Sequence, residues 1–294
     1  MFINACLIIL SFLTTGLIYF FTGIYSNPWW YFAAPPLLIA FYLAGVATWL
    51  LILYLGGFFV KKDPDYVYKP SRFAQWIVSQ TAWVILVVLR VKVHASGFGK
   101  IPSGTPVVLI HNHLSVFDEF ALVSSFKKPI VFISKPSNFR LPIAGAWMRY
   151  AGYISIVQDD IASGTEVIRK ATAYLTEKKM SVCIAPEGTR NKHFPNPLIL
   201  PFKPGALRLA TDSGKPVVVA ALQNTNAVTF RFPKKTHIYL DIVSVVERDE
   251  FQTMTAKELA DRCRNDILRR FEQKEARFYH LPAHEEEKEG ESAS

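Results

Sequence analysis

The chain has 294 residues, half of them hydrophobic, and a formal net charge of +9 at neutral pH. Residues 1–60 contain no Lys, Arg, Asp or Glu, although about 15 would be expected at the usual ~25% of charged residues. A basic body beside an uncharged segment favours an anionic membrane surface or phosphorylated ligands as partners. Nucleic acid is disfavoured because no nucleic-acid-binding motif occurs. The three cysteines, Cys6, Cys183 and Cys263, fit no disulfide framework or zinc pattern, which indicates a reducing compartment.

Two apolar runs open the chain, at residues 2–25 and 37–60. Each is about 24 residues long, enough to cross a bilayer core of roughly 30 Å. No Lys or Arg precedes the first run, which is also too long for a signal peptide. Lys61 and Lys62 end the second run, so the positive-inside rule predicts a transmembrane hairpin with both ends on the cytoplasmic side. The alternative is an unusually apolar pair of core helices in a soluble protein.

Residues 73–89 are uncharged but include polar side chains such as Gln75 and Gln80. They predict either a third membrane span or a helix that lies at the interface or packs on the domain. We favour the second alternative, because a third span would place the rest of the chain outside the cytoplasm.

From Arg90 the pattern alternates between short β-branched runs and helical segments, which predicts an α/β fold with a largely parallel sheet flanked by helices. Ser163 with Glu166 and Thr255 with Glu258 have the spacing of helix-capping boxes, and Gly214 is placed to end a helix. The predicted strands are residues 91–95, 107–110, 130–134, 153–157, 181–185, 217–222 and 238–246. The predicted regions are a transmembrane hairpin at 1–60, a linker with an interfacial helix at 61–96, a catalytic domain at 97–280 and a disordered acidic tail at 281–294.

A first polar cluster follows the strand predicted at residues 107–110, where His111, Asn112 and His113 precede Asp118. Strand-to-helix junctions of α/β sheets are common ligand sites. His113 can pair with Asp118 if His113 lies in the turn and Asp118 in the first helical turn, because residues five apart do not share a helix face. A carboxylate on Nδ1 would leave Nε2 free as a base. Otherwise the histidines are satisfied polar residues near a helix start.

A second cluster follows the strand predicted at residues 181–185 and consists of Glu187, Gly188, Thr189 and Arg190. Gly188 permits a positive φ and close approach of a ligand. The guanidinium of Arg190 suits a phosphate, and Lys203 follows nearby in the sequence. The cluster therefore predicts an anion site, with a charged surface turn as the alternative.

Together the two clusters resemble the motifs of the glycerolipid acyltransferase family, the 1-acylglycerol-3-phosphate O-acyltransferases. Asn112, His113 and Asp118 match its Asn-His-x-x-x-x-Asp motif, and residues 186–190 match its Pro-Glu-Gly-Thr-Arg motif. The resemblance runs from about Gly97 to Leu222 and includes Lys135 and Lys203. A membrane hairpin ahead of this domain is also common in the family.

The resemblance implies an integral-membrane enzyme that transfers an acyl group to the sn-2 hydroxyl of lysophosphatidate. His113 would be the general base and Asp118 would orient it. Glu187, Gly188, Thr189 and Arg190, with Lys135 and Lys203, would bind substrate. Acyl-CoA or acyl-carrier protein would be the co-substrate, the lysophospholipid and membrane lipids the other partners, and no metal or cofactor is expected. The catalytic domain would face the cytoplasm.

Two residues depart from the family pattern. Gln158 stands where the family usually has an Arg that helps bind phosphate, and Val219 stands where a second proline is usual. A neutral hydrogen bond is worth about 1 kcal/mol against about 1.5–3 kcal/mol for a charge-assisted one. A different lysophospholipid acceptor is therefore an alternative, unless Arg149 or Lys135 compensates.

Two further alternatives belong to other functional classes. His111, His113 and Asp118 could be metal ligands of a hydrolase, since His-x-His with a carboxylate can bind zinc. His94, His193 and His237 sit in no motif that would complete such a site. A catalytically silent lipid-binding scaffold is disfavoured because both His113 and Asp118 are present.

Overall fold

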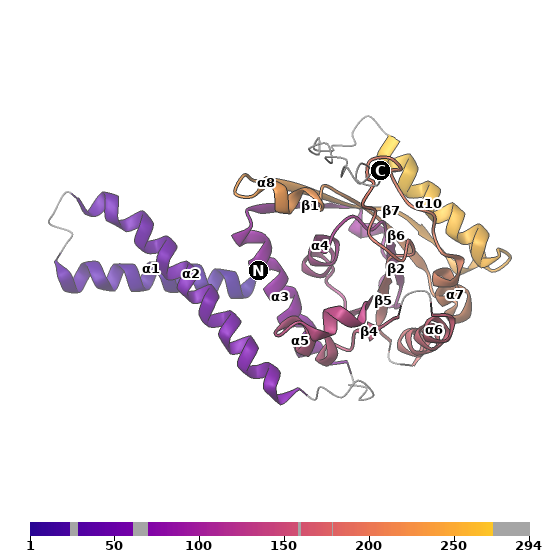
Figure 1. The fold of residues 1–294 in the computed structure, drawn as a ribbon, viewed down its shortest axis with the longest axis horizontal. Coiled ribbons are helices and arrows are strands. Elements are labelled where there is room, and N and C mark those ends of the chain that lie inside the picture. The colour runs from indigo at the N-terminus through magenta and orange to yellow at the C-terminus, as the bar shows by residue number, and fades with distance from the viewer. Residues whose placement is uncertain (24–28, 61–69, 158–159, 178, 273–294) are drawn as a thin grey trace, which may run out of the picture.

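The computed structural model describes residues 1–23, 29–60, 70–157, 160–177 and 179–272. A helical hairpin projects from one end of an α/β domain in which helices cover both faces of a single sheet (Figure 1). Gln158 and residues 281–294, on which two of the sequence predictions depend, lie outside the described residues.

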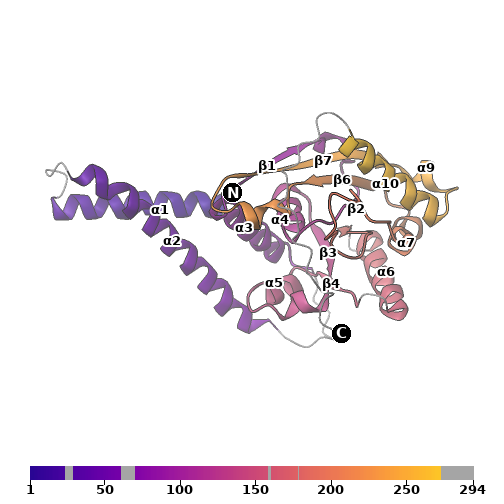
Figure 2. The ribbon, with the colours of Figure 1, turned by 45° about the horizontal axis from the view of Figure 1, so that its top comes forward.

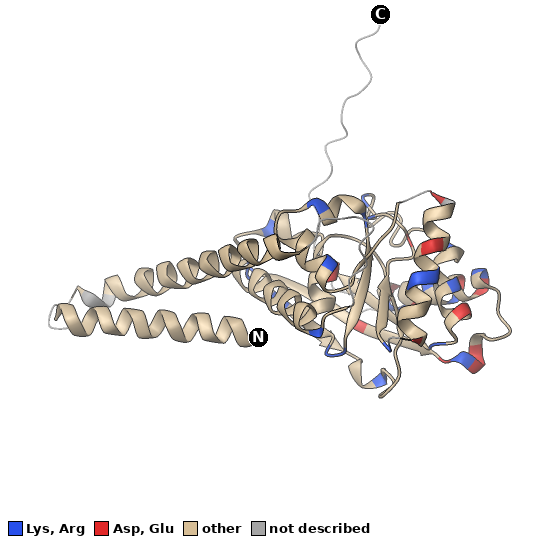
Figure 3. Ribbon diagram, turned by 90° about the horizontal axis from the view of Figure 1, so that it is seen from below, with Lys and Arg blue, Asp and Glu red and all other residues tan. Residues whose placement is uncertain are grey.

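The hairpin consists of α1 (Phe2–Thr22) and α2 (Trp30–Gly56). Both are long and apolar enough to cross a membrane, and only 11% and 6% of their most apolar windows are buried. This exposure contradicts a pair of soluble core helices, and Figure 3 shows both helices free of charged residues. The second apolar run of the sequence begins at residue 37, but helix α2 begins at Trp30. Pro35 and Pro36 therefore lie inside the helix.

Helix α3 (Arg72–Val88) joins the hairpin to the domain. It packs against α1 on one side and against α4, α5 and β1 on the other. Six of its residues are buried, including Ile77 and Val84. Trp49 of α2 donates to the hydroxyl of Thr81 at 3.2 Å. At 17 residues α3 is also shorter than the ~20 needed for a span. The structure therefore favours the domain-packing interpretation over a third span.

All seven predicted strands are present, with ends shifted by at most two residues. They form one sheet in the order β1-β7-β6-β2-β5-β3-β4, in which only the β6–β7 pair is antiparallel. β1 belongs to this sheet, so the domain begins ahead of the predicted boundary at Gly97. The strands are β1 (Val91–Ser96), β2 (Val108–His111), β3 (Ile130–Ser134), β4 (Ile154–Ser155), β5 (Ser181–Ile184), β6 (Val217–Gln223) and β7 (Thr236–Val246).

Two of the three predicted helix ends are confirmed. Thr255 and Glu258 exchange the hydrogen bonds of a capping box, and Gly214 ends its helix at φ 61°. The third is wrong: Asp160, not Ser163, caps α6, because its carboxylate accepts from the backbone of residues 162 and 163. The domain helices are α4 (Phe117–Ser125), α5 (Ala144–Tyr150), α6 (Ile161–Thr176), α7 (Pro204–Ser213), α8 (Ala227–Arg231), α9 (Arg248–Phe251) and α10 (Ala256–Glu272).

The sheet divides the apolar core into two layers. Side chains of α6, α7 and α10 pack with alternate strand residues on one face, and side chains of α3 and α4 pack on the other (Figure 2). The central strands β2, β5 and β6 are buried along their whole length, as expected of strands covered on both faces. The two polar clusters follow β2 and β5, which are parallel neighbours, so both lie at the same edge of the sheet.

Gly97 provides a test of this packing. It adopts φ +74°, and a Cβ there would lie 2.5 Å from the Ile242 carbonyl oxygen on β7, whereas a Cβ at Gly99 would meet nothing within 4 Å. We expect Gly97→Ala to lower the free energy of unfolding by about 2 kcal/mol or more. The left-handed backbone disfavours any side chain at this position, and the added Cβ would also clash with the Ile242 carbonyl oxygen. Gly99→Ala should change it by less than ~0.5 kcal/mol. Denaturant unfolding in detergent checks both, and equal stabilities would contradict the packing.

Candidate active site

A cavity of about 1070 Å³ opens at the shared edge of β2, β3 and β5. Residues from both sequence clusters line it: His113 from the first, and Gly188 and Arg190 from the second. Lys135, which follows β3, and Lys203, which precedes α7, also line it. Five of the eight predicted site residues therefore surround one space.

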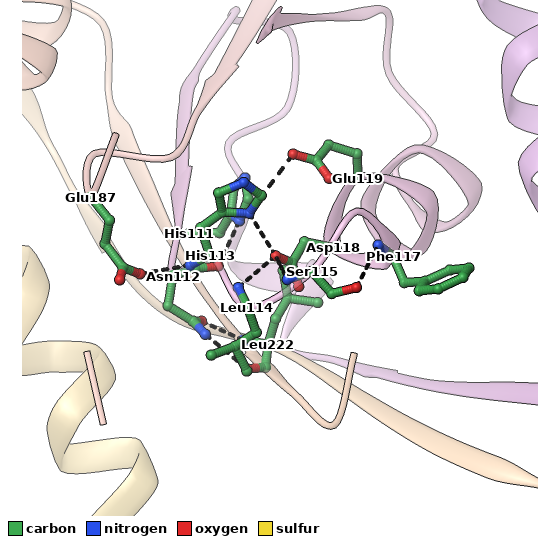
Figure 4. Close-up of polar contacts among 10 residues, drawn as sticks. All are labelled: His111, Asn112, His113, Leu114, Ser115, Phe117, Asp118, Glu119, Glu187 and Leu222. Carbon is green, nitrogen blue, oxygen red and sulfur yellow. Dashed lines mark hydrogen bonds and ion pairs between the residues drawn. The ribbon is translucent and has the colours of Figure 1, made fainter. Parts of the chain in front are cut away.

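The predicted pairing of His113 with Asp118 is present. His113 lies in the loop after β2, and Asp118 lies in the first turn of α4 (Figure 4). The Nδ1 of His113 is 2.8 Å from Oδ2 of Asp118, a carboxylate that is fully buried. The same oxygen accepts the backbone N–H groups of Leu114 at 2.8 Å and Ser115 at 2.9 Å. Oδ2 of Asp118 thus accepts three donors, which holds the imidazole with its proton on Nδ1 and leaves Nε2 as the basic nitrogen.

The pKa of the two histidines shifts in opposite directions. Burial lowers the pKa of His113, but the hydrogen bond and charge of Asp118 outweigh burial, and the charges of Glu119 and Glu187 add to them, so the pKa is raised above 6.5. Burial lowers the pKa of His111 to about 4. His111 is therefore neutral at physiological pH, and its Nδ1 contacts the Asn112 carbonyl oxygen at 2.8 Å.

Glu119 is a site residue that the sequence analysis missed. It lines the cavity, and its Oε1 lies 3.9 Å from Nδ1 of His113. Burial raises its pKa to about 7, although the nearby His113 acts in the opposite direction. The available signal was its position beside Asp118 in the first helical turn, which turns a second carboxylate toward the same histidine.

The side chain of Asn112 fixes the loop after β2 to strand β6. Its Nδ2 donates to the Leu222 carbonyl oxygen at 3.0 Å, and its Oδ1 accepts the Leu222 N–H at 2.8 Å. The side chain thus replaces a backbone partner for β6 at the point where β2 ends. Since Asn112 is fully buried, it positions His113 and does not contact a ligand.

Glu187 has a structural place rather than the predicted contact with substrate. It is 3% exposed and does not line the cavity. Its Oε1 accepts the backbone N–H of His113 at 2.6 Å, and its Oε2 accepts the N–H of Leu200 at 3.0 Å. The Asn191 N–H donates to the carbonyl of His113 at 2.8 Å. Glu187 and Asn191 therefore hold the N–H and the carbonyl of His113, respectively.

Gly188 gives Lys203 its place in the cavity wall. Gly188 has the expected positive φ, +72°, and a Cβ there would lie 3.0 Å from Cε of Lys203. Thr189 is exposed and does not line the cavity, so its predicted substrate contact has no counterpart in the cavity wall. The turn thus exposes Arg190 and Lys203 to the cavity, while Glu187 points away from it.

Positively charged side chains gather in the wall of the active-site cavity. Lys135, Arg190, Lys203 and Arg208 all line the cavity. Arg149 does not: it donates to the Phe139 carbonyl oxygen at 2.8 Å and lies over the Phe139 ring. It is thus excluded as the group that compensates for Gln158, whereas Lys135 is available.

Val219, the other departure, lies in the middle of β6 with its side chain fully buried. It pairs with Ile110 of β2 and with Ser244 of β7, next to an irregularity in the β6–β7 register. A proline here would remove a backbone donor from a central strand. The departure therefore affects the sheet and not the cavity wall.

The geometry changes which residues could act together as metal ligands. The candidate ligand atoms that lie within 4.8 Å of one another belong to His113, Asp118 and Glu119, without His111. The Nδ1 of His113 is hydrogen-bonded to Oδ2 of Asp118, and that oxygen also accepts two backbone N–H groups.

The fold and site define an α/β acyltransferase domain. A family model described as Acyltransferase matches residues 90–223. A solved structure, the 1-acyl-sn-glycerophosphate acyltransferase PlsC from Thermotoga maritima, superposes with a TM-score of 0.59 over 92% of this chain and 99% of that one, at 19% identity. This likeness extends through the hairpin and concerns the fold.

The curated relatives agree. A 1-acyl-sn-glycerol-3-phosphate acyltransferase from Borreliella burgdorferi is 24% identical over 64% of this chain and 75% of its own length. The chloroplastic enzyme of the same description from Arabidopsis thaliana is 32% identical over 63% and 51%, respectively, and that from Salmonella typhimurium is 25% identical over 53% and 63%. The chain thus matches about half to three quarters of these relatives. Its residues 90–223 match the acyltransferase family whose motifs the two clusters resemble.

The His113–Asp118 pair predicts a specific pH dependence. His113 is a base only when unprotonated, so kcat/KM should rise with pH through its raised pKa, above 6.5. Asp118→Asn removes the largest raising cause and leaves burial, so the rising limb should move to lower pH. Turnover should fall by roughly 10²-fold or more, because the amide favours the wrong tautomer. A pH–rate profile of both proteins checks this, and an unmoved limb would contradict the assignment to His113.

Proposed function

We propose that this protein is a membrane-bound 1-acylglycerol-3-phosphate O-acyltransferase, which transfers a fatty acyl group to the sn-2 hydroxyl of lysophosphatidate and produces phosphatidate. The observation that carries the proposal is the His113–Asp118 pair in the wall of a cavity that Lys135, Arg190, Lys203 and Arg208 also line. The descriptions of the curated relatives support the same reaction.

The residues present supply each step. Nε2 of His113 accepts the proton of the acceptor hydroxyl while Asp118 stabilises the resulting imidazolium. The acceptor oxygen attacks the thioester carbonyl directly, the C–S bond breaks, and the departing thiolate takes the proton back from His113. An ester and a free thiol result, and neither an acyl-enzyme nor a metal takes part. Arg190, Lys203 and Lys135 are proposed to hold the phosphate of the acceptor.

We further propose that the hairpin anchors the enzyme in the cytoplasmic membrane, with the domain on the cytoplasmic side. The exposed apolar surfaces of α1 and α2 support anchoring, and Lys61 and Lys62 after the second run support the orientation. Acyl-CoA and acyl-carrier protein are the two donor classes that carry the required thioester.

Acyl transfer by the purified, detergent-solubilised protein tests the proposal directly. Both donors should be offered against lysophosphatidate and against phosphodiester lysophospholipids. We expect lysophosphatidate to be the best acceptor and chelation by EDTA to leave the rate unchanged. Preference for a phosphodiester lysophospholipid would assign a different acceptor, consistent with Gln158 in place of Arg. Loss of activity on chelation would contradict the metal-free reaction.

His113→Ala should lower turnover at least ~10²-fold, because it removes the base. His193→Ala is the matched control: His193 is exposed and does not line the cavity, and its hydrogen bonds, to Asn191 and Asn196, use only its backbone. The control should keep full activity. Initial rates at saturating substrates, with thermal melts to verify folding, measure both. Near-normal turnover of a folded His113→Ala protein would rule out His113 as the base.

Arg190→Ala should raise the acceptor KM about tenfold or more and leave the donor KM within about twofold, because a charged hydrogen bond to phosphate is lost. Lys192→Ala controls for loss of charge, since Lys192 is exposed in the same loop but does not line the cavity. Steady-state kinetics with each substrate varied separate the two constants. A change confined to the donor KM would place Arg190 at the donor phosphates instead.

A further inference from the structure

A second concentration of positive charge lies far from the cavity, at the β1 edge of the sheet. Four exposed cations, Arg90, Lys92, Lys234 and Lys235, form what we term the basic edge. The strand register places them together: Thr236 donates to the Arg90 carbonyl oxygen at 3.2 Å, and Lys92 lies opposite His237. None of the four makes an ion pair with an acidic side chain in the part of the chain that the structure describes.

Two exposed aromatic rings border these charges. Phe230, at the end of α8, is 42% exposed, and Phe232, in the turn that follows, is 50% exposed. Arg231 lies between them and donates to the Lys235 carbonyl oxygen at 3.3 Å, which holds the turn against the start of β7. Exposed aromatic rings beside unpaired cations are typical of surfaces that lie at the headgroup level of a membrane.

The basic edge also borders a second cavity. This cavity, of about 340 Å³, has Lys92 and Lys235 among its lining residues, together with Ser124 and Ser125. The remaining wall is mostly apolar and includes Trp83 and Leu86. It shares no lining residue with the active-site cavity. Cations and hydroxyls beside an apolar wall match the chemistry of a phosphate headgroup attached to acyl chains.

The position of the basic edge supports a lipid ligand. α8 and the turn after it lie at the end of the domain from which the hairpin projects, close to the start of α1, in both views (Figures 1 and 2). α3 packs against both α1 and β1, and Thr81, which contacts Trp49 of the hairpin, is two residues from Trp83 in the cavity wall. If the hairpin enters a bilayer, the basic edge faces its surface.

We propose that the basic edge binds anionic phospholipid of the membrane surface, with a headgroup phosphate at Lys92 and Lys235, acyl carbon in the hollow beside Trp83, and Phe230 and Phe232 at the interface. This inference rests on the membrane anchoring proposed above. An acidic protein would satisfy the charges alone, but the exposed rings and the apolar wall would then have no use. The site is separate from the active site and holds the domain in a fixed orientation on the bilayer.

The test uses the full chain reconstituted in vesicles of phosphatidylcholine, with or without phosphatidylglycerol. A fluorophore is attached at Phe230→Cys in a Cys6→Ala background, since Cys183 and Cys263 are buried. Quenching by lipid-borne nitroxides reports contact with the membrane. Leu13→Cys, 59% exposed on α1, reports hairpin insertion, and Asn265→Cys, exposed on α10, is the distant control.

We expect position 13 to be quenched in both vesicles, position 265 in neither, and position 230 strongly only with phosphatidylglycerol, with the signal falling at high salt. Each Lys near an anionic surface strengthens binding about fivefold. Lys234→Gln with Lys235→Gln should therefore reduce quenching at position 230 to its phosphatidylcholine level. Lys179→Gln with Lys257→Gln, which removes two exposed lysines elsewhere, should leave it unchanged.

Four results would overturn the proposal. Quenching at position 13 but not at position 230 would refute the basic edge as a lipid site and leave the proposed function intact. Equal quenching at position 230 in both vesicles would refute recognition of anionic lipid. If lipid nitroxides did not quench the fluorophore at position 230, but added acyl-carrier protein shielded that fluorophore from solvent, the basic edge would be assigned to an acidic protein. Absence of quenching at position 13 would instead refute membrane anchoring itself and this proposal with it.

Discussion

The hydrogen bonds between the loops after β2 and β5 are the constraint on which the rest of the site depends. Glu187 accepts the N–H of His113, and the Asn191 N–H donates to the carbonyl of His113. The backbone of His113 is therefore held independently of the hydrogen bond between its side chain and Asp118. Neither loop contains regular structure that would hold it alone. The parallel pairing of β2 with β5 brings the loops to one edge, and Asn112 ties the first of them to β6. The geometry of the base is thus a product of three strands.

The same constraint sets the electrostatics around His113. Asp118 is buried under three donors, whereas burial raises the pKa of both Glu119 and Glu187 to about 7. Three carboxyl groups therefore lie near one imidazole, and only one oxygen, Oδ2 of Asp118, accepts the imidazole nitrogen together with two backbone N–H groups. Lys135, Arg190 and Lys203 line the same cavity. In the proposed reaction, the base and these cations would hold the hydroxyl and the phosphate of one acceptor.

The sequence was most informative where one local pattern determines one local structure. The strands were recognisable because burial on both faces makes them short apolar runs, and the His113–Asp118 pair followed from where a strand gives way to a helix. Contacts between distant segments were not predictable in this way. Glu187 has the residue type of a ligand-binding group, and only the fold shows that both of its oxygens are used by backbone N–H groups. Asp160 and Ser163 are both suitable N-cap residues for α6. Which of them caps the helix depends on where the chain leaves β4, and the sequence does not show this.

Cys183 carries a consequence for the fidelity of the proposed reaction. This cysteine of β5 lies in the wall of the active-site cavity and is 1% exposed. Burial, and then the charges of Glu119 and Asp118, raise the pKa of its thiol. Only a thiolate exchanges readily with a thioester. An enzyme that receives activated acyl groups beside its own sulfur therefore avoids acylating itself, and the carboxyl groups that serve the histidine also keep that sulfur inert toward alkylating reagents.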